Sequence, residues 1–332
     1  MEQKQSGGIG GWIGNLFRPR GGNGEAEAIH QATEQAVQVA DPTIRLASRY
    51  RKVLREPVAG AMHYCRTLFA VIPGPVQLSR DGYHSDPVVK ALFASPEELE
   101  EVLRINPELN RLRQQGQRGE VTAMMTMLSG ERTMFGHQQV GETLMRDVAM
   151  RAVSFSDHRI VAAAASLDGA RTGVVHRGME VLATVAMERI TTLRTRRSEL
   201  QEQKIRLKGM MKILGGRNHV CEMFAAPSST NRDELRKAEE ALAEVDRELA
   251  ELQASFATPE HALGQLEAIL RAPEKTLTAR RQSFRLDWKG IRVDDQPEVE
   301  GHAIDLAEFL VGEELRRSAV LVTFALQPAA AA

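Results

Sequence analysis

The sequence predicts a mainly α-helical protein: a helical body, a long antiparallel coiled-coil hairpin and a small C-terminal α+β unit. Apolar residues that repeat about every 3.5 positions predict the hairpin, and capping residues placed before prolines predict several helix starts. An alternating stretch near the C-terminus predicts strands. The expected segments are a Gly-rich leader (1–24), the helical body (25–175), the hairpin with a turn at about 215–230 (176–256), a further helix (257–272), and a β-β-α-β unit with a Pro-Ala tail (273–332).

The leader is rich in glycine, and we expect it to be disordered. It contains a short apolar cluster followed by two arginines. Aromatic and aliphatic groups beside arginine suit the headgroup boundary of a membrane, so residues 9–20 could form a docking peptide or a weak membrane-surface anchor. The apolar residues of this cluster are Trp12, Ile13, Leu16 and Phe17.

In the helical body, helix starts are marked by a capping side chain followed by proline at the first helical position. These pairs are Asp41-Pro42, Asp86-Pro87, Ser95-Pro96 and Asn106-Pro107, with Thr258-Pro259 after the hairpin. Residues 120–150 are rich in methionine, which fills irregular cores or lines adaptable partner grooves, and we favour core filling. Tyr83 and His84 follow an irregular loop, where they fill the surface or line a site.

The hairpin has two arms of opposite charge. The first arm has leucines at seven-residue spacing, and the second alternates apolar residues three and four apart. Residues 177–212 carry nine Lys/Arg against four Asp/Glu, whereas residues 232–251 carry four against eight. The opposite charges favour pairing of the two arms, within one chain or between two copies. Homo-oligomers through the coiled coil therefore remain open.

The C-terminal unit is predicted from a change of pattern. Residues 284–288 alternate, Lys289-Gly290 makes a turn, and residues 291–293 resume the alternation, as in a β-hairpin. A helix is expected around Ile304 to Leu310, followed by a strand at residues 319–326. Two or three strands are only marginally stable alone. We therefore expect them to pack on helices or on another chain.

Composition excludes several classes of function. The net charge is −1 and there are two cysteines, Cys65 and Cys221, which indicates free thiols in a reducing, cytoplasmic setting. Neither a membrane-spanning apolar run nor a secretory signal is expected. Binding of nucleic acid is unlikely on this pattern, because the acidic arm neutralises the basic one and no aromatic residues interleave the basic ones.

No recognisable catalytic motif or metal-ligand spacing occurs, so no cofactor and no metal are predicted. The best alternative active site is near His137, Asp157 and His158, because a histidine beside a carboxylate can act in acid–base catalysis. Adjacent residues on a strand point to opposite faces, however, so Asp157 and His158 need not cooperate. A structural role is the preferred interpretation of each histidine.

The function predicted from these observations is that of a non-enzymatic interaction or scaffold protein. Its hairpin would dock a protein partner of unknown identity, through the apolar residues Val220, Met223 and Phe224 near the expected tip. Two alternatives remain: an enzyme of unrecognised type with a site on the helical body, and a peripheral membrane-associated scaffold anchored through residues 9–20.

Overall fold

The computed structural model describes residues 23–140, 143–224, 229–256, 258–294, 299–313 and 315–326. Its contacts divide the chain into two compact units. The helical unit comprises Met1–Pro57 and Ala183–Ile269, and the sheet unit comprises Val58–Leu182 and Leu270–Ala332.

The predicted mainly α fold class is wrong, because the sheet unit is built on a six-stranded, largely antiparallel sheet. Its longest strands, β2 (Gly119–Val140) and β3 (Thr143–Ala164), occupy the segment predicted as helical body, and they form a β-hairpin, not a coiled coil. The first half of β2 is buried on both faces, as Val121, Met124 and Met125 show. A strand buried on both faces has no alternation to detect, and methionine favours helices in isolation. Pairing within the sheet outweighs that propensity.

The C-terminal segment also differs from its prediction. It forms three strands, β4 (Leu277–Leu286), β5 (His302–Val311) and β6 (Leu315–Leu326), and the helix expected around Ile304 to Leu310 is part of β5. A short apolar run fits a helix or a strand by its pattern alone. Hydrogen bonding of β5 to β4 on one side and β6 on the other decides in favour of the strand.

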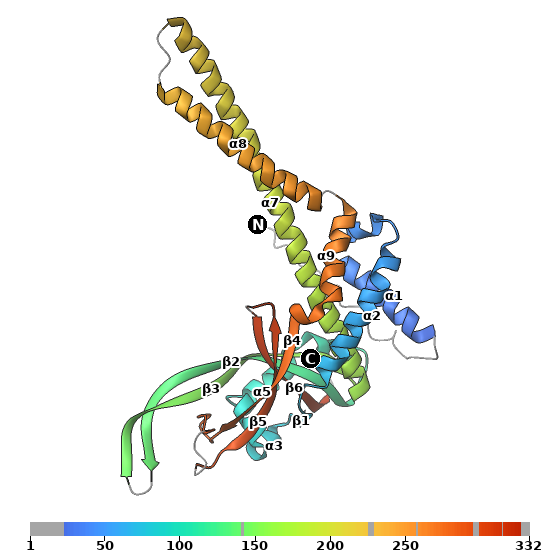
Figure 1. Ribbon diagram of the computed structural model, residues 1–332. Helices are drawn as coiled ribbons and strands as arrows, with labels where there is room; N and C mark the ends of the chain where they lie inside the picture. Colours follow the sequence, from blue (N-terminus) through green and yellow to red (C-terminus); the bar gives the residue numbers. More distant parts are fainter. Residues whose placement is uncertain are drawn as a thin grey trace. The chain divides into compact units, whose positions relative to one another are not determined.

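The strand order of the sheet is β3-β2-β6-β5-β4, and the two-residue strand β1 (Val76–Gln77) pairs in parallel with β6 (Figure 1). The first part of β6 pairs with β5, with Ala319 opposite Ala307, and its later part pairs with β2, starting with Ser318 opposite Met127. Beyond Met127, β2 has β3 as its only neighbour among the described strands. The hairpin therefore continues past the sheet as a two-stranded ribbon.

Strand β3 has three bulges. At each register shift, two β3 residues oppose one residue of β2. One residue of each bulge has a positive φ angle: 56° at Asp147, 51° at Asp157 and 56° at Ala162. Bulges of this kind bend the strand and increase its twist. They also change the direction of the side chains beside them, which matters for Asp157.

Four short helices cover one face of the sheet: α3 (Arg80–Ser85), α4 (Pro87–Leu92), α5 (Pro96–Ile105) and α6 (Pro107–Gln114). The last three begin where the cap-and-proline pattern predicts them. Their capping side chains accept backbone N–H groups of the first turn, which would otherwise lack partners inside the helix. The caps of α3, α4, α5 and α6 are Ser79, Asp86, Ser95 and Asn106.

The main core lies between these helices and the sheet. Leu92, Leu99 and Leu109 from the helices belong to the same buried cluster as Met125 and Phe324 from the strands. Each such side chain contributes about 1.5–3 kcal/mol when fully buried. Met124, Met125 and Met127 of β2 thus do fill a core, although from a strand and not from a helix, whereas Met134 farther along β2 is 52% exposed.

The other face of the sheet contacts the start of α7 (Leu167–Phe224), whose Val174 belongs to a second buried cluster that includes Met124. The approach is close at Gly173, where an added Cβ would lie 2.8 Å from the Cβ of Ala162. From Val58 on, α2 (Tyr50–Phe69) also belongs to this unit. Only a residue without a side chain fits at position 173.

The helical unit contains the remaining helices. They are α1 (Asn23–Ala40), the 3-10 helix η1 (Pro42–Leu46), α8 (Ser229–Phe256) and α9 (Pro259–Arg271). The second 3-10 helix, η2 (Pro273–Lys275), belongs to the sheet unit. Asp41 caps η1 by accepting the backbone N–H of Thr43, and it also forms an ion pair with Arg194 of α7. This buried carboxylate therefore connects η1 to the long helix.

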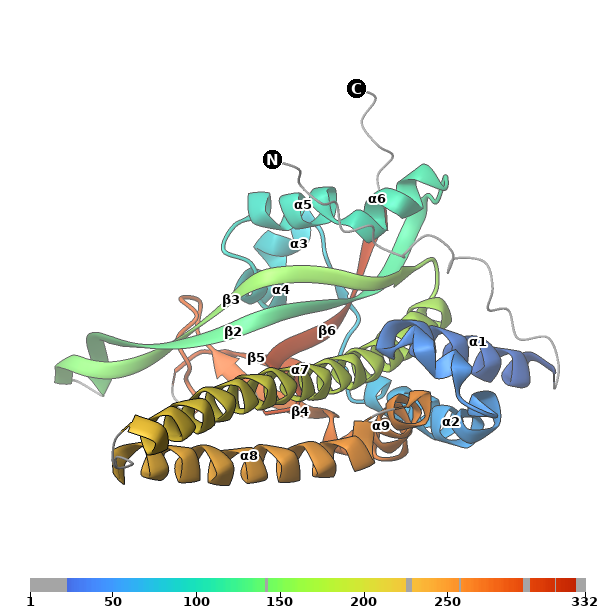
Figure 2. The ribbon, with the colours of Figure 1, turned by 90° about the horizontal axis from the view of Figure 1, so that it is seen from above.

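Helices α7 and α8 lie side by side (Figure 2). Leu200 of α7 is buried in one cluster with Val245 and Leu249 of α8. Two ion pairs connect the helices, Arg196 with Glu248 at 2.7 Å and Lys204 with Asp246 at 2.6 Å. The basic arm and the acidic arm thus contact each other within one chain.

Helix α7 ends at Phe224 and α8 begins at Ser229, and both residues lie within the predicted turn range of about 215–230. Helix α7 continues through Gly215 and Gly216 to Phe224. A glycine costs about 1 kcal/mol in a helix interior relative to alanine, and burial of the neighbouring Leu214, which is 4% exposed, offsets part of this cost. None of the described helices is both long enough and apolar enough to cross a bilayer.

Candidate functional site

His158 is a structural residue of the sheet unit. Its ring is 1% exposed and stacks on Phe93, with the ring centroids 4.6 Å apart. Nε2 lies 2.7 Å from the carbonyl oxygen of Leu92, and Nδ1 lies 3.4 Å from Oε1 of Glu98. Since a carbonyl only accepts hydrogen bonds, Nε2 donates. The ring thus connects β3 to α4 and α5, and it is closed to a substrate.

Asp157 does not act together with His158. Its carboxylate binds Arg317 at 2.7 Å and Arg159 at 3.1 Å. These bonds, first the one from Arg317 and then the one from Arg159, lower the pKa of Asp157. An ion-paired carboxylate with a lowered pKa is a poor proton acceptor.

His137 is remote from this pair along the ribbon. Its side chain lies outside the described residues, but its neighbour Gly136 pairs with Val148. This position is about ten residues, or roughly 33 Å, along β3 from His158. The structure does not bring the three residues of the alternative active site together.

The other predicted site residues fall outside the description. The side chains of Val220, Met223 and Phe224, at the end of α7, are not described, and the leader residues Trp12, Ile13, Leu16 and Phe17 lie before the first described residue. Neither the docking tip nor the membrane anchor is tested by the geometry.

Among the described side chains, which do not include that of Cys221, no reactive thiol and no metal site is found. Burial raises the pKa of Cys65 to about 12, so its thiol stays protonated and unreactive at neutral pH. No group of three His, Cys, Asp or Glu residues among those described is arranged to hold a metal ion.

The outer face of α7, which we define as Ile205, Gly209, Met210, Ile213 and Gly216, is exposed. Ile205, Gly209 and Ile213 follow each other at four-residue spacing, so they share one side of the helix. Ile205 is 72% exposed, Met210 52% and Ile213 60%, whereas Leu200, which packs on α8, is 1% exposed. The helix therefore has two apolar faces, of which α8 covers one.

Three cations flank this outer face. Arg206, Lys208 and Lys212 are exposed, and none of them forms an ion pair with a described residue. Lys204, by contrast, is paired with Asp246 of α8. Glu202 lies on the same side, but the three cations outnumber this one carboxylate. The outer face therefore keeps a net positive charge. Its combination of apolar side chains and unpaired cations is typical of a surface that binds an anionic, amphipathic partner.

The two glycines of the outer face have open space around them. No atom lies within 4 Å of a Cβ added at Gly209 or Gly216, so no contact in the described structure requires a glycine there. Each glycine nevertheless costs about 1 kcal/mol in helix stability. A glycine on a helix surface lets another backbone approach closely.

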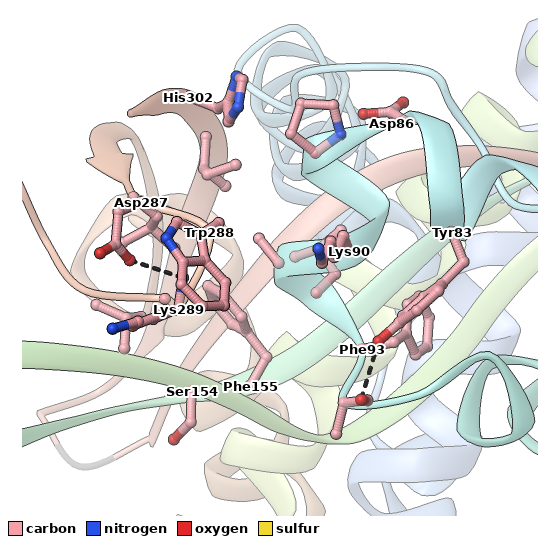
Figure 3. Close-up of a pocket in the computed structure, with 18 of the residues that line it drawn as sticks. Tyr83, Asp86, Lys90, Phe93, Ser154, Phe155, Asp287, Trp288, Lys289 and His302 are labelled. Atoms are coloured by element: carbon pink, nitrogen blue, oxygen red, sulfur yellow. Dashed lines mark hydrogen bonds between the residues drawn. The ribbon is translucent and has the colours of Figure 1, made fainter. Parts of the chain in front are cut away.

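A cleft in the sheet unit is a second place where ligand-binding residues gather (Figure 3). Its volume is about 500 Å³, and it lies between α3–α4 on one side and the turn after β4 on the other. Tyr83 and His84, singled out in the sequence, line it, with Lys90 and Trp288 on opposite walls. Its floor contains Phe155 of β3.

Sequence reasoning missed the outer face of α7 and, apart from Tyr83 and His84, the residues of the cleft. The spacing of Ile205, Gly209 and Ile213 was a usable signal for a second helix face, but the stronger heptad of leucines on the same helix hid it. Lys90 and Trp288 are far apart in the sequence, and no local pattern links them.

Comparison of the chain with protein-family models, with curated proteins and with solved structures finds no match. Function is therefore inferred from the geometry alone.

Proposed function

We propose that this protein is a non-enzymatic interaction protein that holds a protein partner against the outer face of α7. The observation that carries the proposal is the exposure of Ile205, Met210 and Ile213 beside three cations without ion-pair partners among the described residues. Full burial of an isoleucine is worth about 1.5–3 kcal/mol, so a partner covering these side chains would gain substantial free energy.

The chemistry of the partner follows from the same residues. Lys208 and Lys212 lie one helical turn apart and favour a surface of acidic side chains. Gly209 and Gly216 lie seven residues apart and leave room for a second helix to approach the backbone of α7. The occupant that fits is an amphipathic helix with an apolar stripe and acidic flanks, as in helix-in-groove recognition.

The enzyme alternative has no comparable support, because Asp157 and His158 are engaged in separate structural contacts. A basic, apolar helix face also fits an anionic membrane surface, and two copies of the chain could meet there. An experiment must distinguish these occupants.

Site-specific photo-crosslinking tests the proposal. A benzoylphenylalanine at position 213 of the full chain should crosslink to a protein in cells, whereas the same group at position 243, on an exposed part of α8, should not. The acidic helical segment of that protein, made as a synthetic peptide, should bind the purified chain. Replacing Lys208 and Lys212 together with glutamine should weaken this binding about tenfold.

Three outcomes would contradict the proposal. Crosslinks from position 213 to lipid would favour the membrane surface, and crosslinks to a second copy of the chain would favour a homo-oligomer. Peptide binding that is unaffected by the double lysine substitution would show that charge complementarity does not operate.

A further inference from the structure

The turn that forms one wall of the cleft is held rigidly. Oδ1 of Asp287 accepts the backbone N–H groups of Lys289 and Ile291, each at 2.8 Å. Gly290 adopts a φ of 76°, and its carbonyl accepts the N–H of Val153 at 2.8 Å. Trp288 is thus presented by a fixed backbone.

Trp288 is 74% exposed, although a tryptophan is one of the largest apolar side chains. The ammonium group of Lys289 lies 4.8 Å from the centroid of its ring, which is cation–π geometry. The indole is therefore a fixed aromatic surface on one wall of the cleft, with a cation beside it.

Lys90 and Lys289 supply the cations of this cleft, which also holds two carboxylates. Of its two carboxylates, Asp86 accepts the backbone N–H of Val88 at 2.8 Å, and Asp287 accepts the two N–H groups of its own turn. Lys90, on the opposite wall from Trp288, forms no ion pair with any described residue (Figure 3). Asp86 and Asp287 keep their negative charge but are directed to backbone N–H groups, so an anion in the cleft would meet the ammonium groups of Lys90 and Lys289.

An extended peptide does not fit as well. A peptide that adds to the edge of a sheet needs the free N–H and C=O groups of the edge strand. At β3 these groups are occupied, because Val153 donates to Gly290 and Arg151 accepts from Arg292. The cleft has the volume of a small-molecule site, and its lining combines aromatic and aliphatic side chains with polar and charged groups.

We propose that this cleft binds a small aromatic anion, in which a planar ring stacks on Trp288 and a carboxylate or phosphate group meets Lys90. Both an aromatic carboxylic acid and a nucleoside monophosphate have this chemistry. This site is independent of the outer face of α7.

Trp288 itself reports binding, because the chain has only two tryptophans. In a full-length Trp12→Phe protein, 2-naphthoate and AMP are titrated separately. Two controls accompany them: 2-naphthalenemethanol has an aromatic ring but no charge, and inorganic phosphate has a charge but no ring. We expect at least one of the two aromatic anions to bind saturably and to change the Trp288 fluorescence, and the tighter of the two identifies the source. Lys90→Gln should weaken that binding about threefold to tenfold, whereas Lys275→Gln, an exposed lysine of the same unit outside the cleft, should leave it unchanged.

Trp288→Leu, measured by calorimetry, should weaken binding about tenfold. The proposal fails if neither aromatic anion binds saturably up to about 10 mM. It also fails if the uncharged naphthalene binds as tightly as the naphthoate, or if Lys90→Gln and Trp288→Leu leave the affinity unchanged while the circular dichroism of each variant is that of the parent protein.

Discussion

Arg317 of β6 reaches across β2 to the bulge of β3, where it binds both the carboxylate and the backbone carbonyl of Asp157. The Nη1–Oδ2 distance is 2.7 Å and the Nη2–O distance is 2.6 Å, and Nε lies 3.3 Å from Oγ1 of Thr126 on the intervening strand. One guanidinium thus connects three strands at the point where β3 holds a residue at positive φ. It stabilises a backbone conformation that aspartate adopts at a cost.

The ion pair of Asp157 predicts a pH dependence of stability. The folded protein holds the pKa of this carboxyl below its ordinary value of 3.8. The resulting stabilisation is therefore complete above that value and is lost as the pH falls through the folded pKa. In urea titrations, Asp157→Asn should be less stable than the parent at pH 7 by less than about 1 kcal/mol, because the pair is partly exposed. The difference should shrink below pH 4, and a constant difference would contradict this assignment.

His158 should matter for stability. His158→Phe keeps a planar ring beside Phe93 but removes the donor to the carbonyl of Leu92. A buried carbonyl left without its partner costs about 1–3 kcal/mol, which chemical denaturation would measure. His84→Phe, at a histidine of the cleft wall that is at the surface, is the matched control and should change the free energy of unfolding much less. Equal effects would show that His158 has no special role.

Gly173 and Gly264 form a matched pair of helical glycines. Gly173→Ala places a Cβ 2.8 Å from that of Ala162, whereas a Cβ at Gly264 meets nothing within 4 Å. We expect Gly173→Ala to destabilise the protein by about 1–3 kcal/mol through overpacking. Gly264→Ala should instead stabilise it by up to about 1 kcal/mol, the ordinary helix-propensity difference. Thermal unfolding followed by circular dichroism compares the two, and a stabilising Gly173→Ala would refute the close contact.

A substitution at Gly209 tests the proposed docking without destabilising the fold. Because the space around it is open, Gly209→Leu should keep or slightly raise the stability of α7. It should weaken binding of the partner's helix by about tenfold or more, since the backbones could no longer approach. Calorimetry with the partner peptide measures the affinity, and Gly264→Ala again serves as the control. Unchanged affinity would place the partner's helix elsewhere.

Much of the local structure could be predicted from the sequence. The starts of α4, α5 and α6 depend on a capping side chain and a proline within a few residues, and they lie where the sequence places them. At the start of α5, Ser95 accepts the backbone N–H of Glu98, and Glu98 accepts the backbone N–H of Ala94, the residue before the cap. Each of these interactions joins residues within about one helical turn of each other in the sequence.

The sheet could not be predicted in the same way. Met125 is a strand residue because it pairs with Val320 of β6, and Ile304 because it pairs with Phe284 of β4, in each case with a partner remote in the sequence. Their own segments carry the composition of a helix or an ambiguous pattern. The hydrogen bonds and the register of a strand depend on its partner strands, and these are often remote in the sequence.

The same distinction between local and long-range determinants applies to the candidate sites. The amino-acid sequence by itself determined the long helices α7 and α8 and their opposite charges, because helical periodicity and charge are properties of neighbouring residues. Which face of α7 stays exposed, and that Lys90 and Trp288 form opposite walls of one cleft, was decided only by the tertiary structure. Exposure and convergence depend on what each side chain packs against, and that is set by contacts between segments remote in the sequence.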